Sequence, residues 1–208
     1  MFTGIVQAKV KVDAIERKPG LITLDITLPS AYADNIKLGA SIAVDGVCLT
    51  VTYFDVKTGR VSFDIMQQTL DLTALSGLNV GDWVNIERSA KLSDEVGGHN
   101  VSGHCDAVVT ISSIETTENN QRISYHYPEH YNKYLFEKGF VALNGCSLTI
   151  ASIDKAKHIL SVAFIPETLK TTTHGLKQLG QSINLELDRQ TQAIVDTVER
   201  VLLEQKTD

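Results

Sequence analysis

The sequence DGVCLTV at residues 45–51 returns as NGCSLTI at residues 144–150, which is 99 positions further along the chain. The same offset relates further pairs on both sides of this stretch. They are Thr3-Gly4 with Ser102-Gly103, Thr69-Leu70 with Thr168-Leu169, and residues 81–87 with residues 180–186. One local slip, in which Gly39 is aligned with Gly139, is reversed within six residues. A constant offset between two long copies indicates a duplicated domain and not a solenoid.

The composition argues against several classes of protein. The 208-residue chain has a net charge of −6, which argues against a nucleic-acid partner because a phosphate backbone binds a basic surface. No apolar run is long enough to span a bilayer, and the first residues do not form a secretory leader. Cys48, Cys105 and Cys146 show no paired spacing, which is typical of reduced thiols and not of a disulfide framework or a zinc site. We therefore expect a soluble cytoplasmic protein with no nucleic-acid or membrane partner.

Each copy has the hydrophobic pattern of short β-strands. Apolar and polar residues alternate over residues 22–28 and 61–65 of the first copy and over residues 123–127 and 183–187 of the second. Closely spaced short strands predict a small closed barrel or a sandwich, because closure removes exposed strand edges. A polar, glycine-bearing connection at residues 88–100 separates the two copies.

The pattern changes to that of a helix from Gln190 onward. Apolar residues recur at intervals of three and four between residues 194 and 202, and neither copy has a counterpart of this segment. Asp188 lies directly before it and is a typical helix N-cap. The apolar stripe could pack on its own barrel or on the same helix of other subunits, and the spacing leaves both possibilities open.

Two polar motifs are candidates for chemistry. The first is GGHNVSGHC at residues 97–105, which carries two Gly-His pairs around the start of the second copy. The second is the matched pair of triplets CLT at residues 48–50 and SLT at residues 147–149.

Taken alone, each of these side chains has a structural explanation. His104 is typical of a histidine at a barrel mouth that bonds a backbone carbonyl, and Cys48 of a small buried apolar residue. Ser147 and Thr149 are ordinary strand residues, and Lys138 is most simply a solvated residue in a turn.

The two copies share a frame but differ in their reactive groups. In the alignment His104 corresponds to Ile5, Ser147 to Cys48, Asp188 to Ser89, and Ala163 to Asp64. A pure binding module has little reason to differ in this way. An enzyme that gives two similar ligands different roles does, so these differences favour an enzyme.

Several blocks resemble the riboflavin synthase family of the alpha-chain type, whose members are lumazine-binding double barrels. The blocks are MFTGIVQ at residues 1–7, DGVCLTV at 45–51, GGH and SGH within 97–104, IPETL at 165–169 and DTVER at 196–200. The resemblance implies an all-β fold of two tandem six-stranded antiparallel Greek-key barrels related by pseudo-two-fold symmetry, followed by a C-terminal α-helix. It divides the chain into an N-terminal lumazine-binding barrel with a linker at residues 1–97, a C-terminal lumazine-binding barrel at 98–187, and a trimerisation helix at 188–208.

The resemblance also implies a reaction. Enzymes of this family are transferases of riboflavin biosynthesis that move a four-carbon unit between two identical molecules of 6,7-dimethyl-8-ribityllumazine. The products are riboflavin and 5-amino-6-(D-ribitylamino)uracil, and no cofactor or metal is implied. The active site takes two lumazines and forms between the first barrel of one subunit and the second barrel of a neighbour in a homotrimer. Catalysis would then depend mainly on holding the two substrates together and on removing a proton from one of them.

Candidate residues follow from the same resemblance. Catalytic roles are implied for Cys48, His104, Ser147, Thr149 and Asp188. The substrate-binding residues implied for the first pocket are Gly4, Ile5, Val6, Ser41, Cys48, Leu49, Thr50, Asp64, Ile65, Met66, Gln67, Gln68 and Thr69. Those implied for the second pocket are Gly103, His104, Cys105, Lys138, Ser147, Leu148, Thr149, Ala163, Phe164, Ile165, Pro166, Glu167 and Thr168. We therefore expect His104 and Ser147 to lie together in the second barrel, with Cys48 in the first.

One residue departs from the family's pattern, and two alternatives remain. Asn144 stands where an aspartate is expected, so a catalytic base at that position would be missing, whereas a role in a turn would survive. The first alternative is a non-catalytic relative that binds one lumazine as a light-emitting antenna. The second is a duplicated barrel that carries an unrelated flavin or pterin. Because Cys48, His104 and Ser147 are all present, both pockets are equipped for chemistry, and we favour the enzyme.

Overall fold

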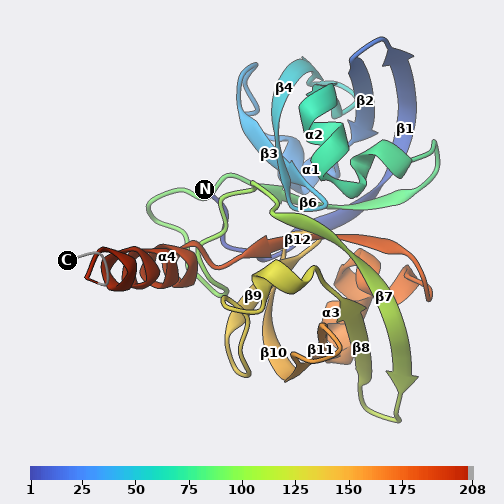
Figure 1. Cartoon of the computed structure of the whole chain (residues 1–208). Helices are drawn as coiled ribbons and strands as arrows, with labels where there is room; N and C mark the ends of the chain where they lie inside the picture. The colour runs from blue at the N-terminus through green and yellow to red at the C-terminus, as the bar shows by residue number, and fades with distance from the viewer. Residues whose placement is uncertain (206–208) are drawn as a thin grey trace.

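Two closed β-barrels make up most of the computed structural model, which describes residues 1–205 (Figure 1). The strands of the first barrel are β1 (Ala8–Lys18), β2 (Leu21–Thr27), β3 (Ser41–Val44), β4 (Val47–Asp55), β5 (Arg60–Met66) and β6 (Trp83–Arg88). Those of the second are β7 (Ala107–Thr116), β8 (Gln121–His126), β9 (Phe140–Leu143), β10 (Cys146–Asp154), β11 (Ile159–Phe164) and β12 (Ser182–Leu187). The α-helices are α1 (Ser30–Ala33), α2 (Gln67–Leu72), α3 (Pro166–Thr171) and α4 (Arg189–Glu204), and the 3-10 helices are η1 (Ala74–Gly77), η2 (Glu129–Tyr131) and η3 (Thr173–Leu176).

Both barrels have the same antiparallel Greek-key order. The first runs β1-β2-β5-β4-β3-β6 and closes through β6 and β1, and the second repeats this order with β7 to β12. In the first barrel β3, β4 and β5 are joined by hairpins, and β6 returns to pair with β3, which defines a Greek key. Strands β9 to β12 repeat this arrangement in the second barrel. The expected fold of two six-stranded barrels and a C-terminal helix is therefore confirmed.

The duplication extends to irregularities in the strands. The pairing register shifts between Val12 and Ala14 on β1 and between Ile111 and Ser113 on β7, which are equivalent positions in the two copies. Further shifts follow Val51 on β4 and Ile150 on β10, again at equivalent positions. Such bulges bend a strand and increase its twist, which helps a short sheet to close on itself.

The structure removes the apparent slip in the alignment of the two copies. The amide of Gly39 donates to the carbonyl of Val51 at 2.9 Å, and the amide of Lys138 donates to the carbonyl of Ile150 at 2.8 Å. Gly39 and Lys138 also share a left-handed backbone, with φ of 82° and 64°. Lys138 is thus the equivalent of Gly39, and the expected match of Gly39 with Gly139 is wrong.

The β3–β4 and β9–β10 turns lie back to back where the barrels meet. Gly46 and Gly145 have φ of 80° and 77°, a conformation that L-residues with side chains rarely adopt. A Cβ atom on Gly46 would lie only 2.5 Å from the amide nitrogen of Gly145. Glycine is therefore needed at this contact both for its conformation and for its lack of a side chain.

Asn144 performs the same structural role in the second copy as Asp45 in the first. The Asp45 carboxylate accepts a hydrogen bond from the amide of Asn85 at 2.8 Å, and the Asn144 side-chain oxygen accepts one from the amide of Asn184 at 2.8 Å. The side chains of Asn85 and Asn184 then cross the interface and donate to the carbonyls of Asn144 and Asp45, each at 2.9 Å. The departure from the family's pattern at Asn144 therefore leaves this turn intact.

Replacing Asp45 with asparagine should raise the free energy of unfolding at neutral pH. Burial raises the pKa of Asp45 to about 6, although Lys177 opposes this shift. Because the folded-state pKa lies above the unfolded value, the contribution of Asp45 to stability is fully present below the unfolded pKa and is lost as the pH rises through about 6. Asp45→Asn should remove this loss, which is roughly 2–3 kcal/mol at pH 7.5 and much smaller at pH 4. Urea denaturation at both pH values measures the difference, and an equal change at both would contradict the prediction.

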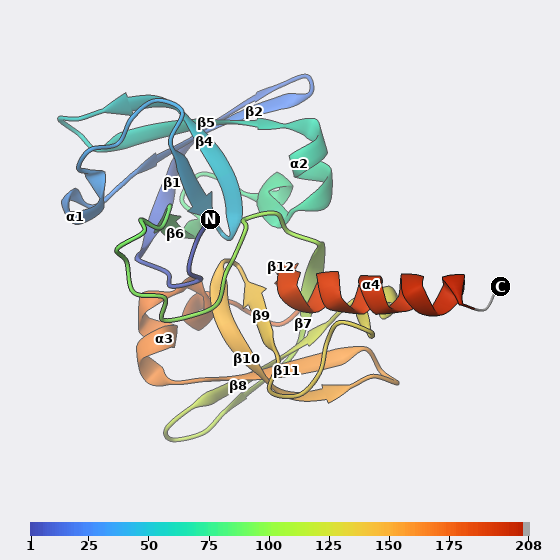
Figure 2. The same ribbon diagram turned by 90° about the vertical axis from the view of Figure 1, so that its left-hand side faces the viewer.

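Helix α4 projects from the junction of the two barrels, as Figures 1 and 2 show. Its N-cap is Asp188, whose carboxylate accepts hydrogen bonds from the amides of Gln190 and Thr191, as expected from the sequence. None of the residues 189–204 is buried, and the stripe residues Ile194 and Val198 are 64% and 51% exposed. The possibility that the stripe packs on its own barrel is therefore wrong. Within residues 1–205, no helix has the length and apolar character needed to cross a lipid bilayer.

Candidate active sites

The start segment of each copy lies against the other barrel. The amide of Ser147, on β10, donates to the carbonyl of Gly4 at 2.7 Å. The amide of Cys48, on β4, donates to the carbonyl of Gly103 at 2.8 Å. The two crossings are related by the offset between the copies, and each candidate site therefore contains residues from both of them.

Glycine is required where the segments cross. Gly4 and Gly103 have φ of 74° and 83°. A Cβ atom on Gly4 would lie 2.5 Å from Cβ of Ser147, and one on Gly103 would lie 2.5 Å from Cβ of Cys48. The backbone can reach this close to the two strands only because these residues have no side chain.

A buried glutamate at the end of each barrel holds the start segment of its own copy. Glu87, on β6, accepts hydrogen bonds from the amides of Thr3 and Gly4 at 2.6 and 3.1 Å. Glu186, on β12, accepts the equivalent bonds from the amides of residues 102–103 at 2.7 and 2.9 Å. Burial raises the pKa of Glu87, while the hydrogen bonds from Thr3 and Gly4 act in the opposite direction. Each segment is thus fixed to one barrel and presented to the other.

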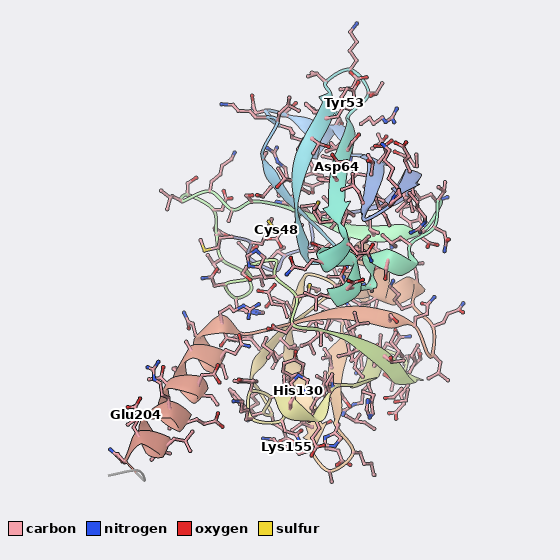
Figure 3. All side chains as sticks on the ribbon, turned by 45° about the horizontal axis from the view of Figure 1, so that its top comes forward. Cys48, Tyr53, Asp64, His130, Lys155 and Glu204 are labelled. Carbon is pink, nitrogen blue, oxygen red and sulfur yellow. The ribbon has the colours of Figure 1, made fainter. Side chains whose placement is uncertain are left out.

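One candidate site, which we name the Cys48 pocket, is a cavity of about 420 Å³. Its lining residues are Val47, Cys48, Gln68, Thr69, Leu72, Thr73, Gly103, His104 and Cys105. Cys48 is half-buried on the outer face of β4, and Figure 3 shows it on the side of the first barrel that faces the second. His104 is exposed, so the pocket combines a thiol with an imidazole that is open to solvent.

The other candidate site, the Ser147 site, contains His99, a histidine of the 97–105 motif to which the sequence analysis assigns no role. Nδ1 of His99 lies 2.6 Å from Oγ of Ser147, and the His99 ring stacks on Phe140 with centroids 5.3 Å apart. His99 is 8% exposed, and its Nε2 atom has no hydrogen-bond partner within residues 1–205. Gly98 packs beside Ser147 almost as closely as Gly4 does, because a Cβ atom there would lie 2.7 Å from Cβ of Ser147.

His99 and Asp188 influence each other electrostatically. Burial lowers the pKa of His99, and the negative charge of Asp188 partly opposes this shift. Burial acts to raise the pKa of Asp188, but hydrogen bonds from Thr191 and Gln190 outweigh it and lower that pKa. Near neutral pH the site therefore combines a neutral imidazole, a hydroxyl and a nearby carboxylate, which is a set of groups that can take up and pass on a proton.

The structure changes the expected grouping of the site residues. His104 lies with Cys48, and not with Ser147 as expected. In the same way, Val6 packs against the core of the second barrel and Cys105 against the core of the first. The expectation was wrong because each segment was assigned to the barrel that follows it in the sequence. The imidazole beside the Ser147 hydroxyl belongs to His99, which precedes the first aligned residue of the second copy and has no counterpart in the first.

The remaining candidates divide by their position on the strands. Thr50 and Thr149 share the outer faces of β4 and β10 with Cys48 and Ser147, because residues two apart on a strand point the same way. Ser41 pairs with Thr50 across the β3–β4 hairpin. Side chains packed in the barrel cores are those of Leu49, Ile65, Leu148 and Phe164. Exposed candidates are Ile5, Asp64, Met66, Gln67, Gln68, Lys138, Ala163, Ile165, Pro166 and Glu167, and partly buried ones are Thr69 and Thr168.

These positions lead to three conclusions. The core residues Leu49, Ile65, Leu148 and Phe164 direct their side chains into the barrels, so only their backbone faces the outer surface. Asp64 accepts a hydrogen bond from Thr23 at 2.7 Å on the outer surface of the first barrel, where Figure 3 shows it. Lys138 lies in the turn before Phe140, the residue on which His99 stacks.

The sequence and the fold both match known lumazine-binding proteins. The family model described as the lumazine binding domain matches residues 3–89 and 102–188. The riboflavin synthase of Escherichia coli (strain K12) is 47% identical over 203 residues, covering 97% of this chain and 93% of the relative. That of Buchnera aphidicola subsp. Schizaphis graminum is 44% identical and covers 97% of this chain and 96% of the relative.

Solved structures show the same architecture. The chain superposes on LumP complexed with 6,7-dimethyl-8-(1'-D-ribityl) lumazine with a TM-score of 0.81 at 25% identity, covering 91% of this chain and 100% of LumP. The complex of LumP with riboflavin gives a TM-score of 0.84 at the same identity and coverage. Because the family model matches both copies and the riboflavin synthases align over nearly their whole length, this chain belongs to the riboflavin synthase family and is built from two lumazine-binding domains.

Proposed function

We propose that the protein is a riboflavin synthase. It transfers a four-carbon unit from one molecule of 6,7-dimethyl-8-ribityllumazine to a second, giving riboflavin and 5-amino-6-(D-ribitylamino)uracil. The identity of 47% to the Escherichia coli enzyme over nearly the full chain supports this activity. The reaction converts two identical substrates, so one becomes the donor and the other the acceptor.

The observation that carries the proposal is the inequality of the two sites. They share one backbone frame, with a glycine packed on the central strand and a glutamate under the start segment. Their reactive groups differ, since one combines Cys48 with His104 and the other combines Ser147 with His99. Equal frames suit two copies of one substrate, and unequal groups suit two different roles.

Proximity and proton transfer are the main contributions of the protein to this chemistry. Holding two reactants in a reactive geometry supplies a large share of the barrier reduction without any other group. At the Ser147 site, neutral His99 is placed to take a proton, with Thr149 on the same face of β10 as Ser147. At the Cys48 pocket, a thiolate is able to add to an electron-poor ring, and His104 lines the same cavity.

We infer that the active protein is a homotrimer, in which the first barrel of one subunit and the second barrel of its neighbour bring two bound lumazines together. The exposed apolar stripe of α4 supports association through this helix. The proposed division is a first barrel with linker at residues 1–97, a second barrel at 98–187 and a trimerisation helix at 188–208, of which residues 206–208 lie outside the described part of the chain. A cytoplasmic location is also proposed, and the free state of Cys48, Cys105 and Cys146 supports it.

Mixing the protein with 6,7-dimethyl-8-ribityllumazine tests the proposed activity. We expect the absorbance of riboflavin to appear, and calorimetry with a substrate analogue to show two sites per chain. The rival function is a non-catalytic antenna, for which the likeness to LumP is the supporting observation. One site per chain and no riboflavin would favour the antenna and overturn the proposed function.

The variants Cys48→Ser and His104→Gln should each lower turnover by about tenfold to a thousandfold, because each removes a reactive group from the Cys48 pocket. Both variants should still bind two ligands, since the backbone frame of the sites is unchanged. His130→Gln is the matched control, because His130 lies on the second barrel far from Cys48 in Figure 3. Steady-state kinetics and calorimetry measure the two effects. Parent-like turnover in both variants would mean that proximity accounts for nearly all the catalysis.

A further inference from the structure

The first residue of α4 contacts the segment that completes the Cys48 pocket. The guanidinium of Arg189 donates through Nη2 to the carbonyl of His104. It also donates through Nη1 to Oδ1 of Asp106 at 2.9 Å, and its Nε lies 3.9 Å from Oε1 of Glu186. One planar cation thus joins the terminal helix, the end of β12 and the pocket segment.

Asp106 makes this contact firm because it is itself held on several sides. Its carboxylate accepts from the amide of Leu187 at 2.8 Å, and its carbonyl accepts from the Tyr131 hydroxyl at 2.6 Å. Gln192, one turn into α4, adds a longer contact of 3.3 Å from Nε2 to Oδ1. The Asp106 side chain is only 10% exposed, so its ion pair with Arg189 is screened less by solvent than a surface pair.

The first copy has no equivalent of this arrangement. The residues that align with Arg189 and Asp106 are Ala90 and Gln7. Gln7 accepts a hydrogen bond from the amide of Arg88 at 2.9 Å, which reproduces the bond from Leu187 to Asp106. The methyl group of Ala90, however, cannot donate to the segment that carries Ile5. The amide of Ala90 donates to the carbonyl of Met1 at 3.0 Å. The first start segment is therefore held here by a backbone hydrogen bond and lacks the side-chain clamp of the second.

We propose that Arg189 is a positioning residue for the Cys48 pocket, and that it couples the order of this pocket to helix α4. By holding the carbonyl of His104, it fixes the backbone from which the His104 side chain meets the pocket. A guanidinium suits this task because its rigid fork can bond a carbonyl and a carboxylate together, whereas a lysine ammonium is a single flexible donor group. The inference rests on the proposed function in the choice of ligand and in the kinetic measurement.

Arg189→Ala tests the proposal, with riboflavin as the probe. Alkylation of Cys48, followed by mass spectrometry, reports on the Cys48 pocket, because burial raises the pKa of the Cys105 and Cys146 thiols and makes them less reactive. We expect the riboflavin concentration that half-protects Cys48 to rise roughly fivefold to tenfold. The affinity of the second site, measured by calorimetry, should not change. In kinetics KM should rise together with a fall in kcat, since both ligand binding and the placement of His104 are affected.

Two further variants control the experiment. Arg189→Lys should restore part of the protection, because the charge remains but the fork is lost. Arg17→Ala is the matched control, since Arg17 donates to the carbonyl of Leu78 at 2.8 Å, outside both candidate sites. The proposal would be overturned if Arg189→Ala lowered the affinity for riboflavin equally at both sites. It would also be overturned if the variant matched the parent in the protection of Cys48. Absence of riboflavin synthesis by the parent would instead refute the proposed function, and the protection measurement would still stand.

Discussion

Replacing Gly103 with alanine should lower turnover at least about a hundredfold, because the added methyl group would separate the His104 segment from β4. A Cβ atom at this position would lie 2.5 Å from Cβ of Cys48 and 3.0 Å from the Phe2 ring. The backbone φ of 83° adds strain of its own, since alanine rarely adopts this conformation. The segment must then move, and a displacement of about 1 Å at a reacting centre is enough for a loss of this size.

Gly20→Ala separates strain from contact in this experiment. Gly20 has a φ of 74°, and a Cβ atom on it would meet nothing within 4 Å. We expect this variant to lose only about 1 kcal/mol of stability and to keep its turnover. If Gly103→Ala had the same mild effect as Gly20→Ala, the crossing of Gly103 over Cys48 would not be essential to the site.

The fold was predictable from the sequence because its determinants are local and occur twice. Alternation over residues 22–28 and 61–65 predicts strands, which the structure contains as β2 and β5, and the position of Asp188 alone predicts the helix cap that it forms. The constant offset of 99 residues shows which positions of the two barrels are equivalent. Patterns of this kind are set by strand and helix periodicity and need no knowledge of distant contacts.

The sites were less predictable because they depend on contacts between the copies. Nothing in the residues around Gly4 or Gly103 indicates that each packs on the other barrel, since the crossing is a tertiary contact. His99 belongs to the candidate motif at residues 97–105, but its role could not be predicted because it lies outside the alignment of the two copies. The glycine pair before it is a signal that a backbone approaches closely there. Lys138 was misaligned because two glycines were matched by identity, whereas the structure places a lysine in the left-handed conformation.

Deleting residues 190–208 should convert a trimer into monomers and remove at least about 99% of the activity, because the proposed active site spans two subunits. The helix contributes little to its own chain, since none of residues 189–204 is buried. The deleted residues contact the second barrel through ion pairs of Lys133 with Asp196 and Glu199, a hydrogen bond from Tyr134 to Asp196, and the longer contact of Gln192 with Asp106. The ion pairs are exposed, and pairs of this kind add little stability. The barrels should therefore stay folded without it, and sedimentation would report the change in mass.

A point substitution makes the same test without removing the helix. Val198→Asp places a charge in the centre of the apolar stripe while Asp188 and Arg189 remain in place, so the cap and the contact with His104 are kept. Ala193→Asp adds the same charge to an exposed position on another face of α4 and is the matched control. Val198→Asp should sediment as a monomer with very low turnover, and its separate sites should still bind riboflavin because each is built within one chain. A trimeric Val198→Asp protein, or a monomer that keeps the parent rate, would show that α4 does not assemble the active site.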